Sequence, residues 1–200
     1  GECHYFNGVR YRLELIERVG KHAVTLLQSG KIKMYVNPDT TILNKEKLLN
    51  EWYRAEFKKR IPELVDKWRA VIGESIYSWG VKKMKTKWGS CNIEKRRIWL
   101  NLELVKKPIN CIEYVVVHEM VHLIERNHNA RFIELMDQFM PNWRLCRDEL
   151  NKLPDSSIPK DSTTTVPIPP WKEIKLHTDE YERLEKKEKE RLDKKKSGKT

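Results

Sequence analysis

The stretch HEMVHLIERNH, from His118 to His128, contains the residues of this chain best suited to metal chemistry. Residues four apart project from the same face of a helix, so His118 and His122 can bind one metal ion together. Glu119 lies one position further round the helix, beside such a metal. This HExxH spacing is typical of sites in which two neutral imidazoles bind zinc and the carboxylate acts as general base on a zinc-activated water. The sequence therefore predicts zinc as cofactor and Glu119 as the catalytic residue.

A third imidazole, that of His128, follows His122 by six residues. One helix face cannot span that distance, so we expect the helix to end near Arg126 and the chain to turn back. Asn127 suits this turn because asparagine tolerates the left-handed backbone conformation. Three histidines leave one zinc position open for water, whereas structural zinc sites fill all four positions and favour cysteine. The predicted metal ligands are therefore His118, His122 and His128; a structural zinc and a chance match to a short motif are the alternatives.

The composition is that of a polar, basic protein. Charged residues make up 34% of the 200 residues, and the formal net charge is +11. No apolar run is long enough for a membrane span and the N-terminus has no signal-peptide pattern, so we expect a soluble, cytoplasmic protein with no membrane partner. The four cysteines are scattered and form no CxxC pair, which favours reduced thiols. The sequence does not indicate an oligomeric state.

Much of the positive charge lies between residues 82 and 97, where the one acidic residue is Glu94. Such a run usually marks a solvated surface. Basic side chains also bind phosphates, and the aromatic ring of Trp88 among them can stack on bases. The alternative function is therefore a nucleic-acid-binding module built on a zinc scaffold, or a protease guided to nucleic acid. Its candidate contacts are Lys82, Lys83, Lys85, Lys87, Lys95, Arg96 and Arg97.

The N-terminal residues 2–40 predict a small β subdomain. Asn7-Gly8, between short apolar runs, is a strong signal for a tight hairpin turn. Apolar and polar residues alternate in residues 11–17 and again in 31–36, as half-buried strands require. We therefore expect a small antiparallel sheet in this part of the chain.

Residues 41–153 predict a core that positions the histidines. Apolar residues recur at intervals of three and four from Lys45 to Ile72, which indicates an amphipathic helix, bent or broken around Pro62. Residues 75–91 and 97–104 are interpreted as strands of a second small sheet.

Three asparagine and proline positions mark the helices around the motif. Asn110 with Glu113 forms a candidate capping pair for the helix that carries the motif. Asn129 can cap a helix that runs through Phe139, and Pro141 can start another that ends near Leu153.

The C-terminal residues have a different character. Residues 154–170 hold five of the nine prolines and a Ser-Thr-Thr-Thr run, which favours an extended linker. Residues 171–200 mix glutamate and lysine with few apolar residues, which predicts a charged tail that is helical or disordered.

Several blocks occur together in a recognisable order: KWGSC, LNLELV, a proline, EYVVVHEM followed by HL, NHNARF and PNW. This combination, over about residues 5–153, resembles the YgjP-like family of zinc metallopeptidases and, more distantly, the SprT-like proteases. The resemblance implies an α+β fold: a minimal zincin-like metallopeptidase domain with the small N-terminal sheet and the charged tail added to it. It also implies that the histidine triad binds the zinc, that Glu119 is the base, and that the substrate is a polypeptide. Asn129 and Ile133 depart from the residues common in the family, which leaves substrate preference open.

An exposed edge strand beside such a site can align an extended peptide through backbone hydrogen bonds. The KWGSC segment is the candidate strand, because the small residues Gly89 and Ser90 allow close approach. The predicted substrate contacts are Trp88, Gly89, Ser90 and Asn101. Core packing is the alternative interpretation of Trp88, since large aromatic residues are common in protein cores.

Overall fold

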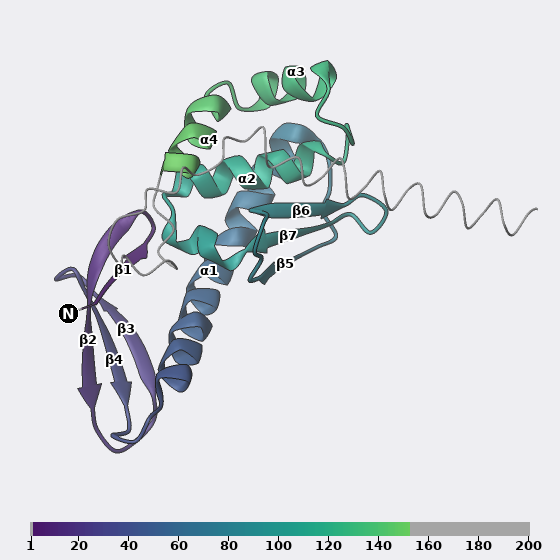
Figure 1. The fold of residues 1–200 in the computed structure, drawn as a ribbon. Helices are drawn as coiled ribbons and strands as arrows, with labels where there is room; N and C mark the ends of the chain where they lie inside the picture. The colour runs from purple at the N-terminus through teal and green to yellow at the C-terminus, as the bar shows by residue number, and fades with distance from the viewer. Residues whose placement is uncertain (1, 153–200) are drawn as a thin grey trace, which may run out of the picture. The chain divides into compact units, whose positions relative to one another are not determined.

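The computed structural model describes residues 2–152, in which strands and helices are mixed (Figure 1). The predicted α+β class is confirmed. The predicted linker and charged tail, residues 154–200, lie outside the described residues. The elements in chain order are β1 (Cys3–Phe6), β2 (Val9–Glu17), β3 (Ala23–Leu27), β4 (Lys31–Val36), α1 (Ile42–Ile72), β5 (Ser78–Lys82), β6 (Gly89–Asn92), β7 (Arg97–Asn101), the 3-10 helix η1 (Leu102–Lys106), α2 (Ile109–Val121), α3 (Ala130–Phe139) and α4 (Trp143–Lys152).

The N-terminal sheet is mixed, so the prediction of an antiparallel sheet was wrong in this respect. Its strand order is β1-β2-β4-β3, and β2 runs parallel to β4 with Leu13 opposite Ile32. The reason is β3, a strand that the sequence pattern did not indicate. It forms an antiparallel pair with β4 at the edge of the sheet. The chain therefore reverses direction twice between β2 and β4, and these two strands lie side by side in parallel.

The predicted turn at Asn7-Gly8 is confirmed. Both residues have positive φ, +52° and +79°, as a two-residue hairpin turn between β1 and β2 requires. The backbone N–H groups of Asn7 and Gly8 donate to the carbonyls of Val105 and Lys106, each at 3.0 Å. A side chain at Gly8 would meet Pro108 at 2.6 Å. The hairpin therefore packs directly on the segment that leads into α2.

α1 is one continuous helix, so no break occurs at Pro62. The Thr41 side chain accepts the N–H of Asn44 at the start of the helix, and Gly73, at φ +79°, ends it. Pro62 is exposed, while buried residues continue along one face on both sides of it, from Leu49 to Ile72. Burial of this face on both sides of the proline offsets the backbone hydrogen bond that proline cannot donate.

The second sheet has the strand order β5-β7-β6, with β5 parallel and β6 antiparallel to β7. Residues 75–91, predicted as one strand, contain two strands joined by a loop. β7 ends at Asn101 rather than continuing to residue 104, and the chain enters η1. The physical cause is the Asn101 side chain, whose Oδ1 accepts the N–H of Glu103 at 3.2 Å and caps η1.

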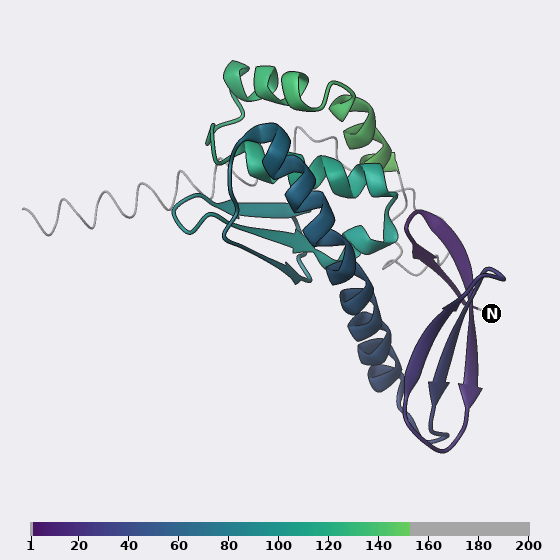
Figure 2. The same ribbon diagram turned by 180° about the vertical axis from the view of Figure 1, so that it is seen from behind.

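α2 lies beside this second sheet, next to β6 and β7 (Figure 1), and the view from behind shows α1 passing along α2 (Figure 2). Ile98 and Leu100 of β7 and Val116 and Met120 of α2 are fully buried. These buried residues fix α2, the helix that carries the motif, against the sheet.

None of the helices in residues 2–152 has the length and apolar composition that a membrane span requires.

The predicted caps had opposite outcomes. Asn110 and Glu113 do not cap α2: Pro108 stands at its N-cap, Asn110 donates to the carboxylate of Glu149, and Glu113 accepts from the ring N–H of Trp68 at 2.9 Å. The cap at Asn129 is confirmed, because its Oδ1 accepts the N–H of Phe132 at 3.0 Å where α3 begins.

Candidate metal centre

α2 provides two histidines and the glutamate of the motif. The helix ends at Val121, earlier than the predicted end near Arg126, and His122 is its C-cap. The backbone of His122 is still helical, at φ −61° and ψ −16°, so its side chain keeps the four-residue spacing from His118. The shorter helix leaves more residues for the turn that returns the chain to the site.

The turn that returns His128 is built by short-range hydrogen bonds. The N–H of Asn127 donates to the carboxylate of Glu125 at 3.1 Å, and the N–H of Asn129 donates to the carbonyl of Asn127 at 2.8 Å. Asn127 does not adopt the left-handed conformation that we predicted, since Asn7 and Arg96 are the described non-glycine residues with positive φ. The turn is stabilised instead by the hydrogen bond from the Asn127 N–H to the Glu125 carboxylate.

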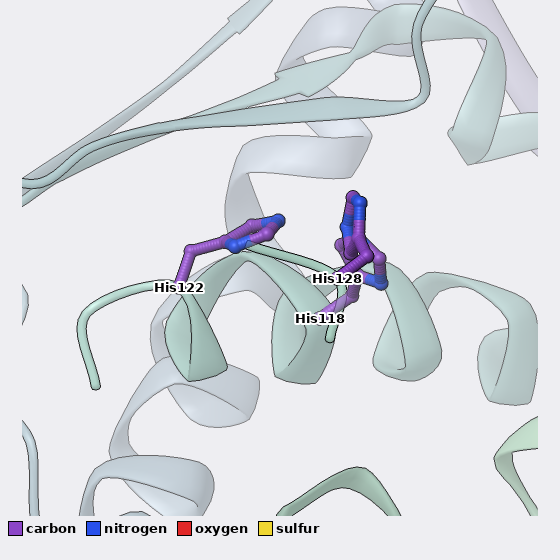
Figure 3. A group of neighbouring side chains, drawn as sticks. All are labelled: His118, His122 and His128. Carbon is purple, nitrogen blue, oxygen red and sulfur yellow. The ribbon is translucent and has the colours of Figure 1, made fainter. Parts of the chain in front are cut away.

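The structure brings all three predicted ligands together (Figure 3). One ring nitrogen from each of His118, His122 and His128 lies within 4.8 Å of the other two, and the Nε2 atoms of His118 and His128 are 3.0 Å apart. Metal–nitrogen bonds are about 2.0–2.1 Å long, so one ion can bind nitrogens at such separations with small side-chain adjustments. The donor set of three imidazoles fits a transition metal such as zinc.

A hydrogen bond orients the His122 imidazole. The Nδ1 atom of His122 lies 3.1 Å from the Glu125 carbonyl, which can only accept a hydrogen bond, so Nδ1 carries the proton. The Nε2 atom of His122 is then the one available as a metal ligand. The His128 residue is exposed overall, but partial desolvation of its imidazole among the neighbouring rings lowers its pKa, which favours the neutral form that binds metals.

Phe132 packs against all three imidazoles and was not among the predicted site residues. Its ring centroid lies 4.9 Å from those of His118 and His122 and 4.7 Å from that of His128. The side chain is 3% exposed and belongs to the first turn of α3, which the confirmed Asn129 cap initiates. Its place three residues after an N-cap indicated a buried helical position, but not contact with the histidines.

Glu119 is buried beside the histidines, on the side of α2 that faces β6. Its side chain is 3% exposed and closely approaches Gly89. Cys91, two residues further along β6, is half-buried. Burial and, to a lesser degree, the negative charge of Glu119 raise the pKa of the Cys91 thiol to about 12, so the neutral thiol is the favoured form.

The predicted substrate contacts divide into two groups. Gly89 and Ser90 lie on β6, an edge strand of its sheet, and Trp88 precedes it with its ring half-buried beside the ammonium group of Lys107 at 5.4 Å. Asn101, by contrast, is 4% exposed, and its side chain bonds both backbone groups of Met84, at 3.3 Å and 2.9 Å. The observed contacts of Asn101 thus hold the loop before β6.

The predicted basic residues are mostly solvent-exposed: Lys82, Lys83, Lys85, Lys95 and Arg97 are exposed, and Lys87 and Arg96 are half-buried. Arg96 is held by an ion pair with Glu74. The structure adds Trp99, with the ammonium of Lys82 at 5.1 Å and the guanidinium of Arg97 at 5.5 Å from its ring centre. The alternation along β7, which sets Trp99 on the face opposite Ile98 and Leu100, is the signal that would have indicated this position.

Comparison with known proteins gives a matching family model and weak likeness to solved structures. The model of the family described as YgjP-like, metallopeptidase domain, matches residues 1–153. Among solved structures, the crystal structure of the metallopeptidase zymogen of Pyrococcus abyssi abylysin matches with a TM-score of 0.42 and 15% sequence identity, over 45% of this chain and 90% of that chain. No curated protein matches.

Proposed function

Because the chain belongs to the YgjP-like metallopeptidase family, we propose that it is a zinc-dependent metallopeptidase that hydrolyses peptide bonds with Glu119 as general base. Membership of the family makes it a peptidase with a catalytic metal and polypeptide substrates. The proposal names the metal as zinc, with His118, His122 and His128 as its ligands. The observation that carries it is the convergence of three imidazole nitrogens within 4.8 Å, beside the buried carboxylate of Glu119.

Zinc held by three imidazoles supplies Lewis-acid polarisation of a carbonyl and lowers the pKa of a water ligand to about 7. The protein residues then handle the proton. Glu119 accepts it from the attacking water and passes it to the amine that leaves.

We further propose that an extended peptide binds along the open edge of β6. Within the described residues β6 pairs with β7 on one side, so its other edge can form backbone hydrogen bonds with a substrate strand. Trp88, Gly89 and Ser90 are the contacts that this placement favours. An unfolded or locally extended polypeptide is the substrate class that fits this mode of binding.

The peptidase proposal is tested with an unfolded protein as substrate. After incubation with the zinc-loaded chain, mass spectrometry of the products should detect new amino termini. Treatment with a chelator should abolish them, and added zinc should restore them. Products that persist unchanged in the metal-free protein would refute the proposal.

We propose residues 2–40 and 41–153 as the two parts of the catalytic domain, with residues 154–200 dispensable for it. The family match ends at residue 153, and the tail composition offers little apolar surface to offset the entropy of ordering. Truncation after Leu153 is expected to leave zinc content and melting temperature nearly unchanged. Calorimetry and metal analysis of the truncated and full chains test this; a drop of several degrees would contradict it.

The surface around Trp99 favours a second candidate function, binding of single-stranded nucleic acid. We define the Trp99 surface as Trp99 with Lys82 and Arg97, whose cations lie within 5.5 Å of its ring centre. Gly80, opposite Trp99 in the sheet, leaves room for the ring, since an added side chain would lie 2.4 Å from it. An aromatic ring flanked by cations is suited to stacking a base and neutralising its phosphates.

Binding of a labelled single-stranded oligonucleotide at several salt concentrations tests this candidate. Trp99→Leu is expected to weaken binding by about 10-fold without changing the salt dependence. Lys82→Gln and Arg97→Gln should each lower the salt slope by about one. Lys47→Gln, an exposed lysine of α1, is the matched control. If nucleic-acid binding were the only function of the chain, the Glu119→Gln variant would bind the oligonucleotide as the wild type does. Absence of binding by the wild type would exclude this function.

A further inference from the structure

We infer that Gly89 is a positioning residue for Glu119, because the space of its missing side chain is occupied by the Glu119 carboxylate. An added Cβ at Gly89 would lie 2.5 Å from Oε1, 2.7 Å from Cγ and 2.9 Å from Cδ of Glu119. These distances are shorter than carbon atoms in van der Waals contact allow. The inference rests on the proposed function in one respect, that Glu119 is the general base.

The Glu119 side chain cannot escape such a clash by rotating its carboxylate alone. The close contact includes Cγ, the second carbon of the side chain, as well as the terminal oxygen. The residue is 3% exposed, so little open space surrounds it. Any side chain at position 89 therefore displaces the whole carboxyl arm of Glu119.

The backbones on both sides of this contact are fixed. Gly89 pairs with Leu100, which is fully buried, and the Trp88 carbonyl accepts the N–H of Asn101 at 2.8 Å. On the other side, the neighbouring α2 residues Val117 and Met120 are fully buried. β6 and α2 cannot move apart without disturbing the core. The side chain of Glu119 therefore has to move.

Glycine at this position is required by close approach and not by backbone conformation. The described glycines with positive φ are Gly8, Gly20, Gly30 and Gly73, and Gly89 is not among them. Alanine at position 89 is therefore compatible with the local backbone. Backbone strain should therefore not contribute to the effect of Gly89→Ala, and the inference assigns that effect to the contact with Glu119.

Gly89→Ala is expected to keep bound zinc and to lower kcat by about 10–100-fold, because a misplacement of about 1 Å in a catalytic group costs this much. Gly80→Ala is the matched control. It adds a methyl group to the same sheet against another large side chain, 2.4 Å from the Trp99 ring. It should lower the melting temperature and leave kcat of the folded fraction unchanged.

A stability cycle on metal-free protein tests the contact independently of activity. Gly89→Ala should lower the melting temperature by about 5 °C in the wild-type background, as overpacking does. In the Glu119→Ala background this loss should disappear, since the clashing side chain is absent. The loss caused by Gly80→Ala should be equal in both backgrounds.

The outcomes separate the two claims. An equal stability loss from Gly89→Ala with and without Glu119, or full kcat in Gly89→Ala, would overturn the positioning role. If Gly89→Ala alone fails to fold, folding of the Gly89→Ala, Glu119→Ala double variant supports the contact, and failure of both refutes it. Activity that survives Glu119→Gln would instead overturn the proposed function and leave the measured contact in place.

Discussion

Replacing Glu119 by glutamine is expected to lower the rate of peptide hydrolysis by about 10²–10⁴-fold while zinc remains bound. The amide has nearly the shape of the carboxylate, so it should fill the same space beside Gly89, but it cannot accept the proton of the attacking water. Turnover of a fluorogenic peptide and zinc content measured on the same preparation test this prediction.

Glu134→Gln is the control for the loss of a carboxylate near the site. Glu134 is exposed on α3 and lies two residues after Phe132. Its substitution should change neither the turnover nor the zinc content. If Glu119→Gln retained wild-type turnover at full zinc occupancy, another group would have to be the base.

Replacing His128 by alanine is expected to abolish stable zinc binding and, with it, the activity. Two imidazoles from one helix then remain, without the third nitrogen that now lies 3.0 Å from that of His118. His128 is exposed in the turn between α2 and α3, so its loss should not unfold the chain. Zinc at about 100 times its Kd stabilises the wild-type fold by about 2.7 kcal/mol, and this stabilisation should vanish in the variant.

Metal analysis and thermal unfolding with and without zinc test the His128 prediction. His22→Ala is the matched control, because His22 is exposed just before β3 and contacts Thr40 instead of the triad. It should bind zinc as the wild type does. Full zinc occupancy in His128→Ala would rule out the third ligand and require another donor.

Local patterns predicted those parts of the fold that depend on neighbouring residues. The Asn7-Gly8 turn and the Asn129 cap are set by backbone conformations and hydrogen bonds within a few residues, and both formed as expected. The four-residue spacing of His118 and His122 likewise determines that they share a helix face. The pairing of these two histidines could therefore be anticipated from sequence alone.

Contacts between distant residues decided the features that the sequence did not predict. The Asn110–Glu113 pair met the rule for a capping box, but Glu149 and Trp68 from other helices bind these side chains instead. The mixed N-terminal sheet depends on β3, whose sequence AVTLL lacks a clear alternation. Tertiary partners overrode the local preference in each case.

The site itself contains two residues of this second kind. Phe132 contacts all three histidines only because the turn after His122 returns the chain, and Gly89 contacts Glu119 only because β6 packs on α2. Sequence spacing carries no information about either approach. The glycine and the phenylalanine nevertheless contact the proposed base and the proposed ligands directly.

The central claim, that one zinc ion held by the histidine triad drives peptide hydrolysis, is tested most directly by titrating zinc into chelator-treated protein while cleavage of an unfolded polypeptide is followed. Activity should rise linearly and reach its maximum at one equivalent of zinc per chain. His122→Ala protein should show no such rise. Cleavage in the metal-free protein, or a zinc-dependent rise that survives in His122→Ala, would contradict the claim.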